Sequence, residues 1–129
     1  MDPLVAHAIA AREQAIAPYS GFKVGAAIET ADGRIFGGCN IESASYGLSA
    51  CAERVALWKA LSEGARQFKR IAVVTDATVL TPPCGACRQV LWEYCGDIPV
   101  LLHSLSGLDQ TFKMSELYPH PFSAQNLPE

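Results

Sequence analysis

The segment between residues 70 and 104 restricts the fold of this chain more than any other. The β-branched run RIAVVTDAT (70–78) predicts a strand, residues 85–95 predict a helix after a proline-rich turn, and IPVLLHS (98–104) predicts another strand. Two strands that are joined through a helix run parallel when they pair in one sheet. A layered α/β fold with parallel neighbouring strands is therefore expected.

The flanking segments add elements of both kinds. Asp2 is placed as a helix cap, and the apolar spacing behind it predicts a helix over 3–17. Residues 22–40 predict two strands around the turn ADG, and a second helix is expected over 50–64. A short strand is expected near QTFKM (110–114). Together these elements predict a three-layer α/β/α sandwich with a mixed sheet of about five strands.

The length and charge of the chain limit its organisation and its partners. With 129 residues, half of them apolar, it can close one core but is short for two, so 1–129 is expected to be a single domain. The formal net charge is −3 and no basic block occurs, which argues against nucleic acid or an anionic membrane as partners and favours a small-molecule substrate. The stretch MDPLVAHAIAAREQ carries charges through its apolar positions and does not look like an export signal, so a cytoplasmic location is expected.

Five cysteines in a chain without an export signal favour reduced thiols or metal ligands over disulfides. In TPPCGACRQVL, Cys84 and Cys87 lie about one helical turn apart across a strand-to-helix turn, and Cys51 has the same position at the start of the preceding helix. The exposed N–H groups of a helix start stabilise thiolates. If both helix starts point to one edge of the sheet, the three sulfurs form three corners of a tetrahedron, which suits a catalytic zinc with one position free for water.

Two neighbours of Cys51 complete this hypothesis. Glu53 can take a proton from the water and later pass it to a leaving group. Three thiolates give the zinc centre a net negative charge that resists ionisation of its water, so a positive group must offset them. Arg54 follows Cys51 by three residues and is expected to donate a hydrogen bond to the sulfurs.

The motifs CAER (51–54) and PCGACRQ (83–89) resemble those of the zinc-dependent cytidine deaminases. The all-cysteine ligand set resembles that of the small homotetrameric members, and the likeness covers nearly the whole chain. The resemblance implies one zinc per subunit on Cys51, Cys84 and Cys87. It also implies hydrolytic deamination of cytidine and deoxycytidine in pyrimidine salvage, by a homotetramer whose subunits share their sites.

By the same resemblance, Asn40 and Glu42 would hydrogen-bond the ribose hydroxyls of the substrate. Residues two apart at a strand end face the same side, and an amide beside a carboxylate can both donate to and accept from a hydroxyl. An ordinary strand-end turn is the alternative for this pair. The backbone N–H of Ala52 would meet the pyrimidine carbonyl or the neighbouring amine.

Several aromatic residues have roles that only the resemblance implies. Phe22 would lie on the pyrimidine, while Tyr46 and Phe122 would reach into the site of a neighbouring subunit. Packing in the core is the alternative for Phe22, and packing within its loop is the alternative for Tyr46. Trp58 lies in an unusually apolar helix and is expected in the core or at a subunit contact.

Three other functions stay open at this point. A nucleoside-antibiotic deaminase shares the motifs. A thioredoxin-like redox protein would use the C-x-x-C of Cys84 and Cys87 and would need neither Cys51 nor Glu53. A structural zinc domain would need a fourth ligand, for which His103 at a strand end is the candidate.

Overall fold

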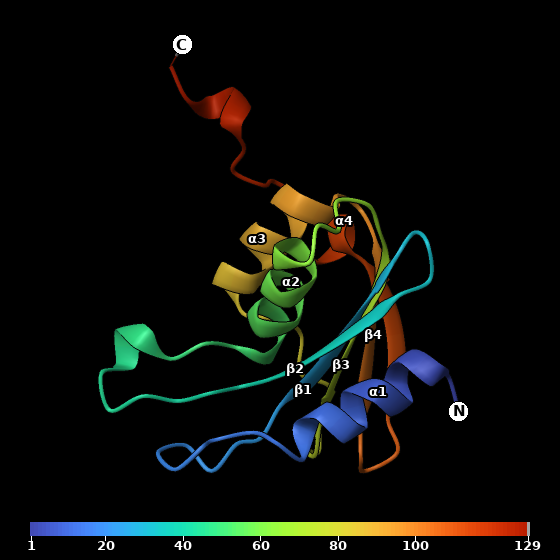
Figure 1. The fold of residues 1–129 in the computed structure, drawn as a ribbon, viewed down its shortest axis with the longest axis vertical. Coiled ribbons are helices and arrows are strands. Elements are labelled where there is room, and N and C mark those ends of the chain that lie inside the picture. The colour runs from blue at the N-terminus through green and yellow to red at the C-terminus, as the bar shows by residue number, and fades with distance from the viewer. Residues whose placement is uncertain (129) are drawn as a thin grey trace.

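The computed structural model describes residues 1–128, and its strands form a mixed sheet (Figure 1). The strand order is β2-β1-β3-β4-β5. β3 and β4 are parallel, as predicted, and the other neighbours are antiparallel. The bounds of the strands are Gly25–Thr30 for β1, Ile35–Cys39 for β2, Phe68–Thr75 for β3, Pro99–Ser104 for β4 and Asp109–Lys113 for β5.

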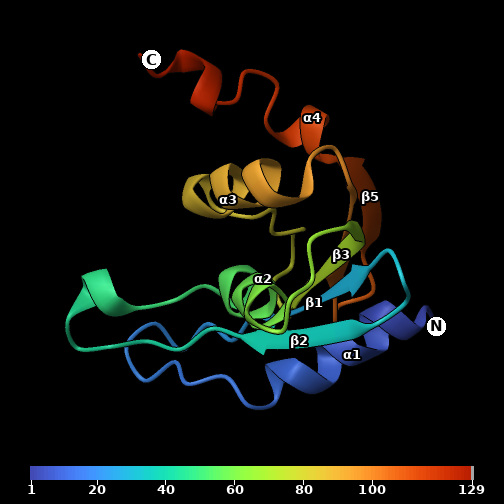
Figure 2. The same cartoon turned by 45° about the horizontal axis from the view of Figure 1, so that its top comes forward.

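Helices cover both faces of this sheet, with α1 on one face and α2 and α3 on the other (Figure 2). α2 and α3 confirm the two helices that were predicted between the strands, and the three-layer α/β/α arrangement is confirmed with them. The bounds of the helices are Pro3–Arg12 for α1, Ala52–Ser62 for α2, Gly85–Cys95 for α3 and Met114–Leu117 for the short α4, with 3-10 turns at Tyr46–Leu48 and Ala124–Asn126.

Alternating side chains of the central strands build two apolar cores. Ile71 and Val73 of β3 belong to the core under α2 and α3, whereas Ala72 and Val74 belong to the core under α1. This alternation is the pattern of a strand that is covered on both faces. Among the described residues, no helix is long and apolar enough to cross a membrane.

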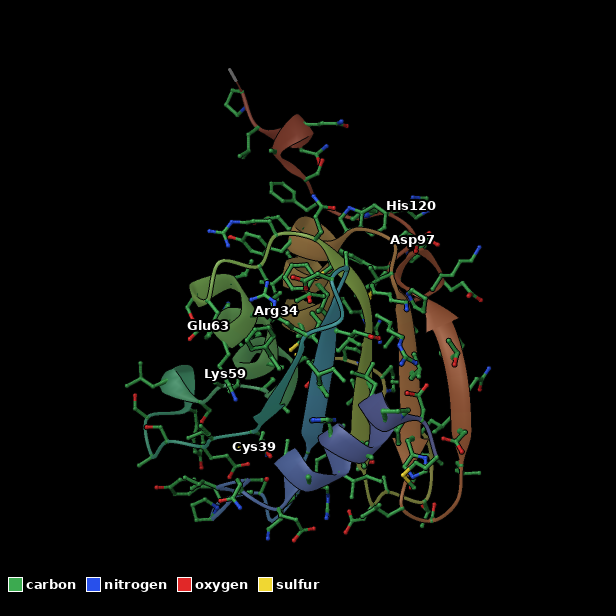
Figure 3. The ribbon with its side chains drawn as sticks, turned by 45° about the vertical axis from the view of Figure 1, so that its right-hand side comes forward. Arg34, Cys39, Lys59, Glu63, Asp97 and His120 are labelled. Carbon is green, nitrogen blue, oxygen red and sulfur yellow. The ribbon has the colours of Figure 1, made fainter. Side chains whose placement is uncertain are left out.

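α2 lies directly against the edge strand β2. A Cβ on Gly38 would lie 2.5 Å from the backbone nitrogen of Ala56, so only glycine allows this approach. Lys59 extends toward the end of β2 (Figure 3), where its Nζ donates to the Gly37 carbonyl at 2.6 Å. These contacts fix α2 on the sheet, and with it the helix start that carries Cys51.

The prediction of a helix over 3–17 is wrong about where the helix ends, because α1 ends at Arg12. The N–H of Ile16 donates to the Asn40 carbonyl at 3.0 Å, and the Ile16 carbonyl accepts from the N–H of Glu42 at 2.8 Å. Bonds to a segment that is distant in sequence thus replace the helical ones. They draw the chain after α1 against the segment that carries Asn40 and Glu42.

Two strand ends also differ from the prediction. The strand expected over 70–78 ends at Thr75, because the Ala77 carbonyl accepts a hydrogen bond from the Ser104 hydroxyl instead of joining the sheet. The strand expected near QTFKM is present as β5, but Met114 begins α4. The earlier end of β3 leaves a loop that leads from the sheet to the start of α3.

Candidate metal centre and active site

Three cysteine sulfurs meet at the starts of α2 and α3. Cys51 is the residue that caps α2, Cys84 caps α3, and Cys87 lies in the first turn of α3. Their Sγ atoms all lie within 4.8 Å of one another, and those of Cys51 and Cys84 are 3.7 Å apart. Within residues 1–128, no further histidine, cysteine or carboxylate joins this cluster.

The cluster fits zinc by its chemistry and by its spacing. Thiolates are ligands that zinc prefers, and two sulfurs bound at about 2.3 Å in a tetrahedron lie about 3.8 Å apart. The separation between Cys51 and Cys84 agrees with that value. Three protein ligands leave the fourth position for a water molecule, which is the arrangement of a catalytic zinc. The cluster of Cys51, Cys84 and Cys87 therefore fits one zinc ion.

The cysteine thiols shift one another's pKa values. A hydrogen bond from the Cys87 thiol lowers the pKa of Cys51 to about 5, and Arg54 adds to this effect with a hydrogen bond of its own. The same bond to Cys51, together with burial, raises the pKa of Cys87. One negative charge is thus already favoured at the start of α2, where the helix N–H groups point.

Arg54 supplies the positive charge that was expected beside the sulfurs. Its Nη2 donates to the Sγ of Cys51 over 3.5 Å. The two residues lie three apart at the start of α2, so one helical turn brings them together. A donor with a full charge draws electron density from the sulfur that accepts it.

Glu53 lies in the first turn of α2, with 5 % of its surface exposed. Burial raises its pKa to about 7, and the negative charge of Cys51 acts in the same direction. A hydrogen bond from the backbone N–H of Glu53 itself opposes this effect most, followed by the charge of Arg54 and a hydrogen bond with Cys87. A carboxyl group with such a pKa can take up and release a proton near neutral pH.

A cavity of about 410 Å³ opens above these groups. Its volume falls within the range of small-molecule sites. It brings together nine of the residues that were singled out in the sequence, namely Phe22, Asn40, Glu42, Tyr46, Cys51, Ala52, Glu53, Arg54 and Cys84. Cys87 is fully buried beneath it.

The side chains of Asn40 and Glu42 form hydrogen bonds that fix the wall of the cavity. The Asn40 amide donates to the Phe22 carbonyl at 2.8 Å and accepts from the N–H of Val24 at 2.9 Å. The Glu42 carboxylate accepts from the hydroxyl and N–H of Ser20 and from the N–H of Tyr19. The hydrogen bonds from Ser20 lower the pKa of Glu42, so this residue is ionised at neutral pH.

The aromatic residues and Ala52 occupy different parts of the site. Phe22 is 37 % exposed at the wall of the cavity. Tyr46 also lines it and packs edge-on against Tyr19, with ring centres 6.0 Å apart. Ala52 is the first residue of α2, so its N–H has no acceptor within the helix.

Phe122 lies outside the cavity of its own chain. It is 55 % exposed on the segment after α4, which extends away from the sheet (Figure 1). Gln89 of α3 fixes this segment by donating to the Phe122 carbonyl at 2.8 Å. Tyr118 in turn donates to Gln89 at 2.5 Å.

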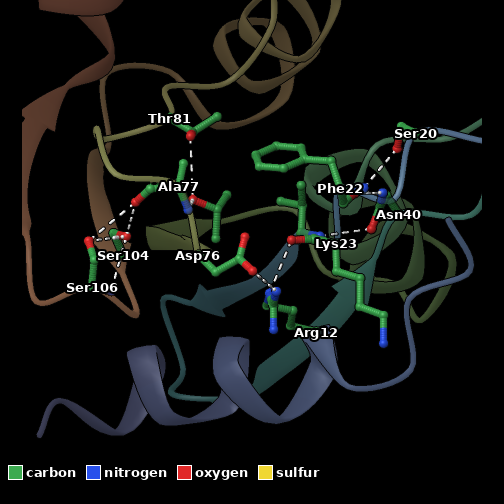
Figure 4. A network of polar contacts seen from close by, with 12 residues as sticks. Arg12, Ser20, Phe22, Lys23, Asn40, Asp76, Ala77, Thr81, Ser104 and Ser106 are labelled. Atoms are coloured by element: carbon green, nitrogen blue, oxygen red, sulfur yellow. Dashed lines mark hydrogen bonds and ion pairs between the residues drawn. The ribbon is translucent and has the colours of Figure 1, made fainter.

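Two residues of this region were missed in the sequence. Ser20 donates its hydroxyl to Glu42 and accepts from the N–H of Phe22, so it joins Glu42 to the aromatic wall of the cavity. Arg12 donates to the Lys23 carbonyl at 3.1 Å and pairs with Asp76 at 3.1 Å (Figure 4). The turn-forming pair Ser-Gly after Tyr19 was a signal for Ser20, whereas nothing local in the sequence marked Arg12.

His103 does not join the sulfur cluster. Its Nδ1 lies 2.5 Å from a carboxylate oxygen of Asp109, its partner across β4 and β5. A structural zinc domain with His103 as fourth ligand therefore does not fit the structure. A dithiol redox protein would not require Cys51 at the same point as Cys84 and Cys87.

Comparison with known proteins agrees with this geometry. Residues 2–101 match the family model described as the cytidine and deoxycytidylate deaminase zinc-binding region. The chain is 53 % identical to a cytidine deaminase of Halalkalibacterium halodurans, over 96 % of this chain and 95 % of the relative. It is 48 % identical to one of Sporosarcina psychrophila, over 98 % and 94 % of the two chains.

Solved structures extend the comparison to the fold. The crystal structure of cytidine deaminase from Burkholderia pseudomallei superposes with a TM-score of 0.88 at 50 % identity, covering 92 % of this chain and 96 % of that one. A blasticidin-S deaminase of Bacillus cereus is more distant, at 34 % identity over 74 % of each chain. With its zinc-binding region, its fold and nearly its whole length matched, this chain belongs to the family of cytidine and deoxycytidylate deaminases.

Proposed function

We propose that this chain catalyses the hydrolytic deamination of cytidine and deoxycytidine to uridine and deoxyuridine, with release of ammonia. The observation that carries this proposal is a buried glutamate beside three converging cysteine sulfurs at the floor of a cavity of nucleoside size. Relatives with about half of their residues identical over nearly the full length carry the name cytidine deaminase. Zinc, when bound by the three thiolates, supplies the Lewis acidity that makes a water molecule acidic near neutral pH.

Glu53 moves the protons of the reaction. Its carboxylate takes a proton from the attacking water as the oxygen bonds to ring carbon 4. The electron pair of the C4–N3 double bond moves to N3, which receives that proton from Glu53. Glu53 then takes the second proton of the added oxygen and gives it to the exocyclic amine. The bond between C4 and this nitrogen breaks, ammonia leaves, and the C4 carbonyl of uridine remains.

The walls of the cavity would bind the nucleoside. Asn40 has one amide hydrogen beyond the one that it donates to Phe22, and Glu42 keeps acceptor capacity on its carboxylate. Both can therefore meet ribose hydroxyls. The ring of Phe22 would lie against the pyrimidine, and the free N–H of Ala52 would meet its polar edge.

We further propose that the chain acts as a single-domain subunit of a homotetramer in cytoplasmic pyrimidine salvage. Reduced thiols as zinc ligands fit a reducing compartment. Tyr46 is 76 % exposed and Phe122 is 55 % exposed, more than large apolar side chains usually are. Each would complete the site of a neighbouring subunit.

A nucleoside antibiotic is the alternative substrate, because the blasticidin-S deaminase shares this family. Its similarity to this chain is lower and covers less of it than that of the cytidine deaminases. Both substrates lose an amine from a cytosine ring, so they must be compared directly.

The test follows ultraviolet absorbance as the purified protein meets cytidine, deoxycytidine or blasticidin S. We expect rapid loss with the first two, abolition by a strong zinc chelator, and recovery when zinc is added back. No loss with either pyrimidine nucleoside, or full activity of protein shown by metal analysis to be zinc-free, would refute the proposal. Faster turnover of blasticidin S than of either pyrimidine nucleoside would show that the antibiotic is the preferred substrate.

A further inference from the structure

The hydrogen bond from Arg54 to Cys51 does not account for every nitrogen of the guanidinium. Its Nε is buried and has no hydrogen-bond partner within residues 1–128. Buried N–H groups without an acceptor are rare, and they cost free energy. A guanidinium held in this way needs another contact to keep it in place.

Trp58 provides that contact. The central carbon of the Arg54 guanidinium lies 5.7 Å from the centre of the Trp58 ring, within the range of cation–π interactions. The two residues are four apart in α2 and so lie on the same side of the helix. Trp58 is 47 % exposed, so its ring is not there chiefly to fill the core, contrary to one of the two places expected for it.

We propose that Trp58 is a positioning residue of the metal centre, which holds the Arg54 guanidinium so that Nη2 stays on the sulfur of Cys51. The inference rests on the proposed function, because it concerns the same metal centre. A thiolate that accepts a hydrogen bond from a cation donates less charge to its metal. The bound zinc thereby remains acidic although all three of its ligands are anionic.

The first test reads the metal centre without any substrate. In the cobalt-substituted protein, the sulfur-to-metal charge-transfer band reports how readily the thiolates give up charge. We expect Trp58→Ala to move this band to longer wavelength, and Trp58→Phe, which keeps an aromatic face, to leave it close to its original position. Tyr94→Ala is the matched control, because Tyr94 is equally exposed on α3. An unmoved band in Trp58→Ala overturns the proposal.

The second test is a double-mutant cycle on kcat/KM for cytidine. Trp58→Ala should lower this value about two- to tenfold, the range that a cation–π contact allows. The same substitution should have almost no further effect in the Arg54→Gln background, since its target is then gone. An equal loss in both backgrounds contradicts the proposal and assigns Trp58 a structural role.

Sedimentation of each variant shows whether a change in oligomeric state accounts for the changes in the band and in kcat/KM. If Trp58→Ala changes only the oligomeric state and leaves the cobalt band in place, the proposal fails. The band does not depend on the identity of the substrate. A shifted band in a protein that ignores cytidine would therefore support Trp58 and refute only the proposed function.

Discussion

Glu53 owes its chemistry to its place two residues beyond a sulfur ligand. At the start of α2 it is removed from water, and this burial raises its pKa to about 7. A carboxyl group on the surface would be ionised and a poor proton donor at neutral pH. The position on the helix thus turns an ordinary acid into a group that can carry protons in both directions.

Replacing Glu53 with glutamine tests this role. We expect the variant to keep its fold and its zinc, because the carboxamide has the same shape and does not ligate the metal. Turnover of cytidine should fall by about 10²- to 10⁴-fold, the contribution of general acid–base catalysis. Metal analysis and steady-state kinetics on the same preparation check both statements. A zinc-loaded variant with near-normal turnover would remove Glu53 from the mechanism.

The residues that a helix start positions were predictable from spacing alone. Cys51 and Arg54 lie one turn apart at the start of α2, and Cys84 and Cys87 lie one turn apart at the start of α3, so local geometry was sufficient for each pair. Ser20 and Arg12 were not predictable in this way. Their roles depend on hydrogen bonds to segments more than ten residues away, which only the folded chain brings together.

At the scale of elements, the spacing of apolar residues and the turn residues between them predicted the strands and the two central helices. The end of α1 could not be predicted, because tertiary hydrogen bonds of Ile16 to the segment 40–42 outweigh the local helix preference. α4 was missed because it has only four residues and no periodic pattern. Elements whose bounds depend on long-range contacts are the ones that differ.

The start of α1 offers a test of electrostatics at this scale. Asp2 caps the helix and is paired with Arg70, and the hydrogen bond from Arg70 lowers the pKa of Asp2. A carboxyl group with a lowered pKa in the folded state stabilises the protein above about pH 4, its unfolded value, and this stabilisation disappears as the pH falls through the folded value.

Asp2→Asn keeps a good helix cap but removes the charge. We expect it to lower the free energy of unfolding at pH 7 by about 0.5 kcal/mol, since the pair is partly exposed to solvent. The difference from the unmodified protein should shrink as the pH falls below 4. Thermal unfolding of both proteins across this range measures it. A difference that is constant with pH would show that the charge of Asp2 is not involved.

At the scale of the whole molecule, the cavity of one chain does not include every residue that the sequence assigned to the site. Glu53, Cys51 and Cys84 line one cavity, while Phe122 lies on an extended segment outside it. The sequence pattern alone does not indicate whether a residue contributes to the site of its own subunit or to that of a neighbouring subunit. Only the resemblance suggested that Tyr46 and Phe122 act across subunits.

Mixed assemblies can test sharing of sites. Glu53→Gln and Phe122→Ala should each have low activity alone, but after mixing and reassembly their activity should exceed the average of the two. In such a mixture some subunits have both an intact Glu53 and a neighbour with an intact Phe122. Glu53→Gln mixed with Cys84→Ala is the control without recovery, because both lesions lie in the same cavity. Equal results for the two mixtures would mean that each site is built from one chain.

The central claim is that three cysteine sulfurs hold one zinc ion and leave a position for water beside Glu53. X-ray absorption spectroscopy of the purified zinc protein tests this claim most directly. The account predicts three sulfur neighbours at about 2.3 Å and one oxygen neighbour at about 2.0 Å. A zinc ion with four sulfur neighbours, or with fewer than three, would contradict it.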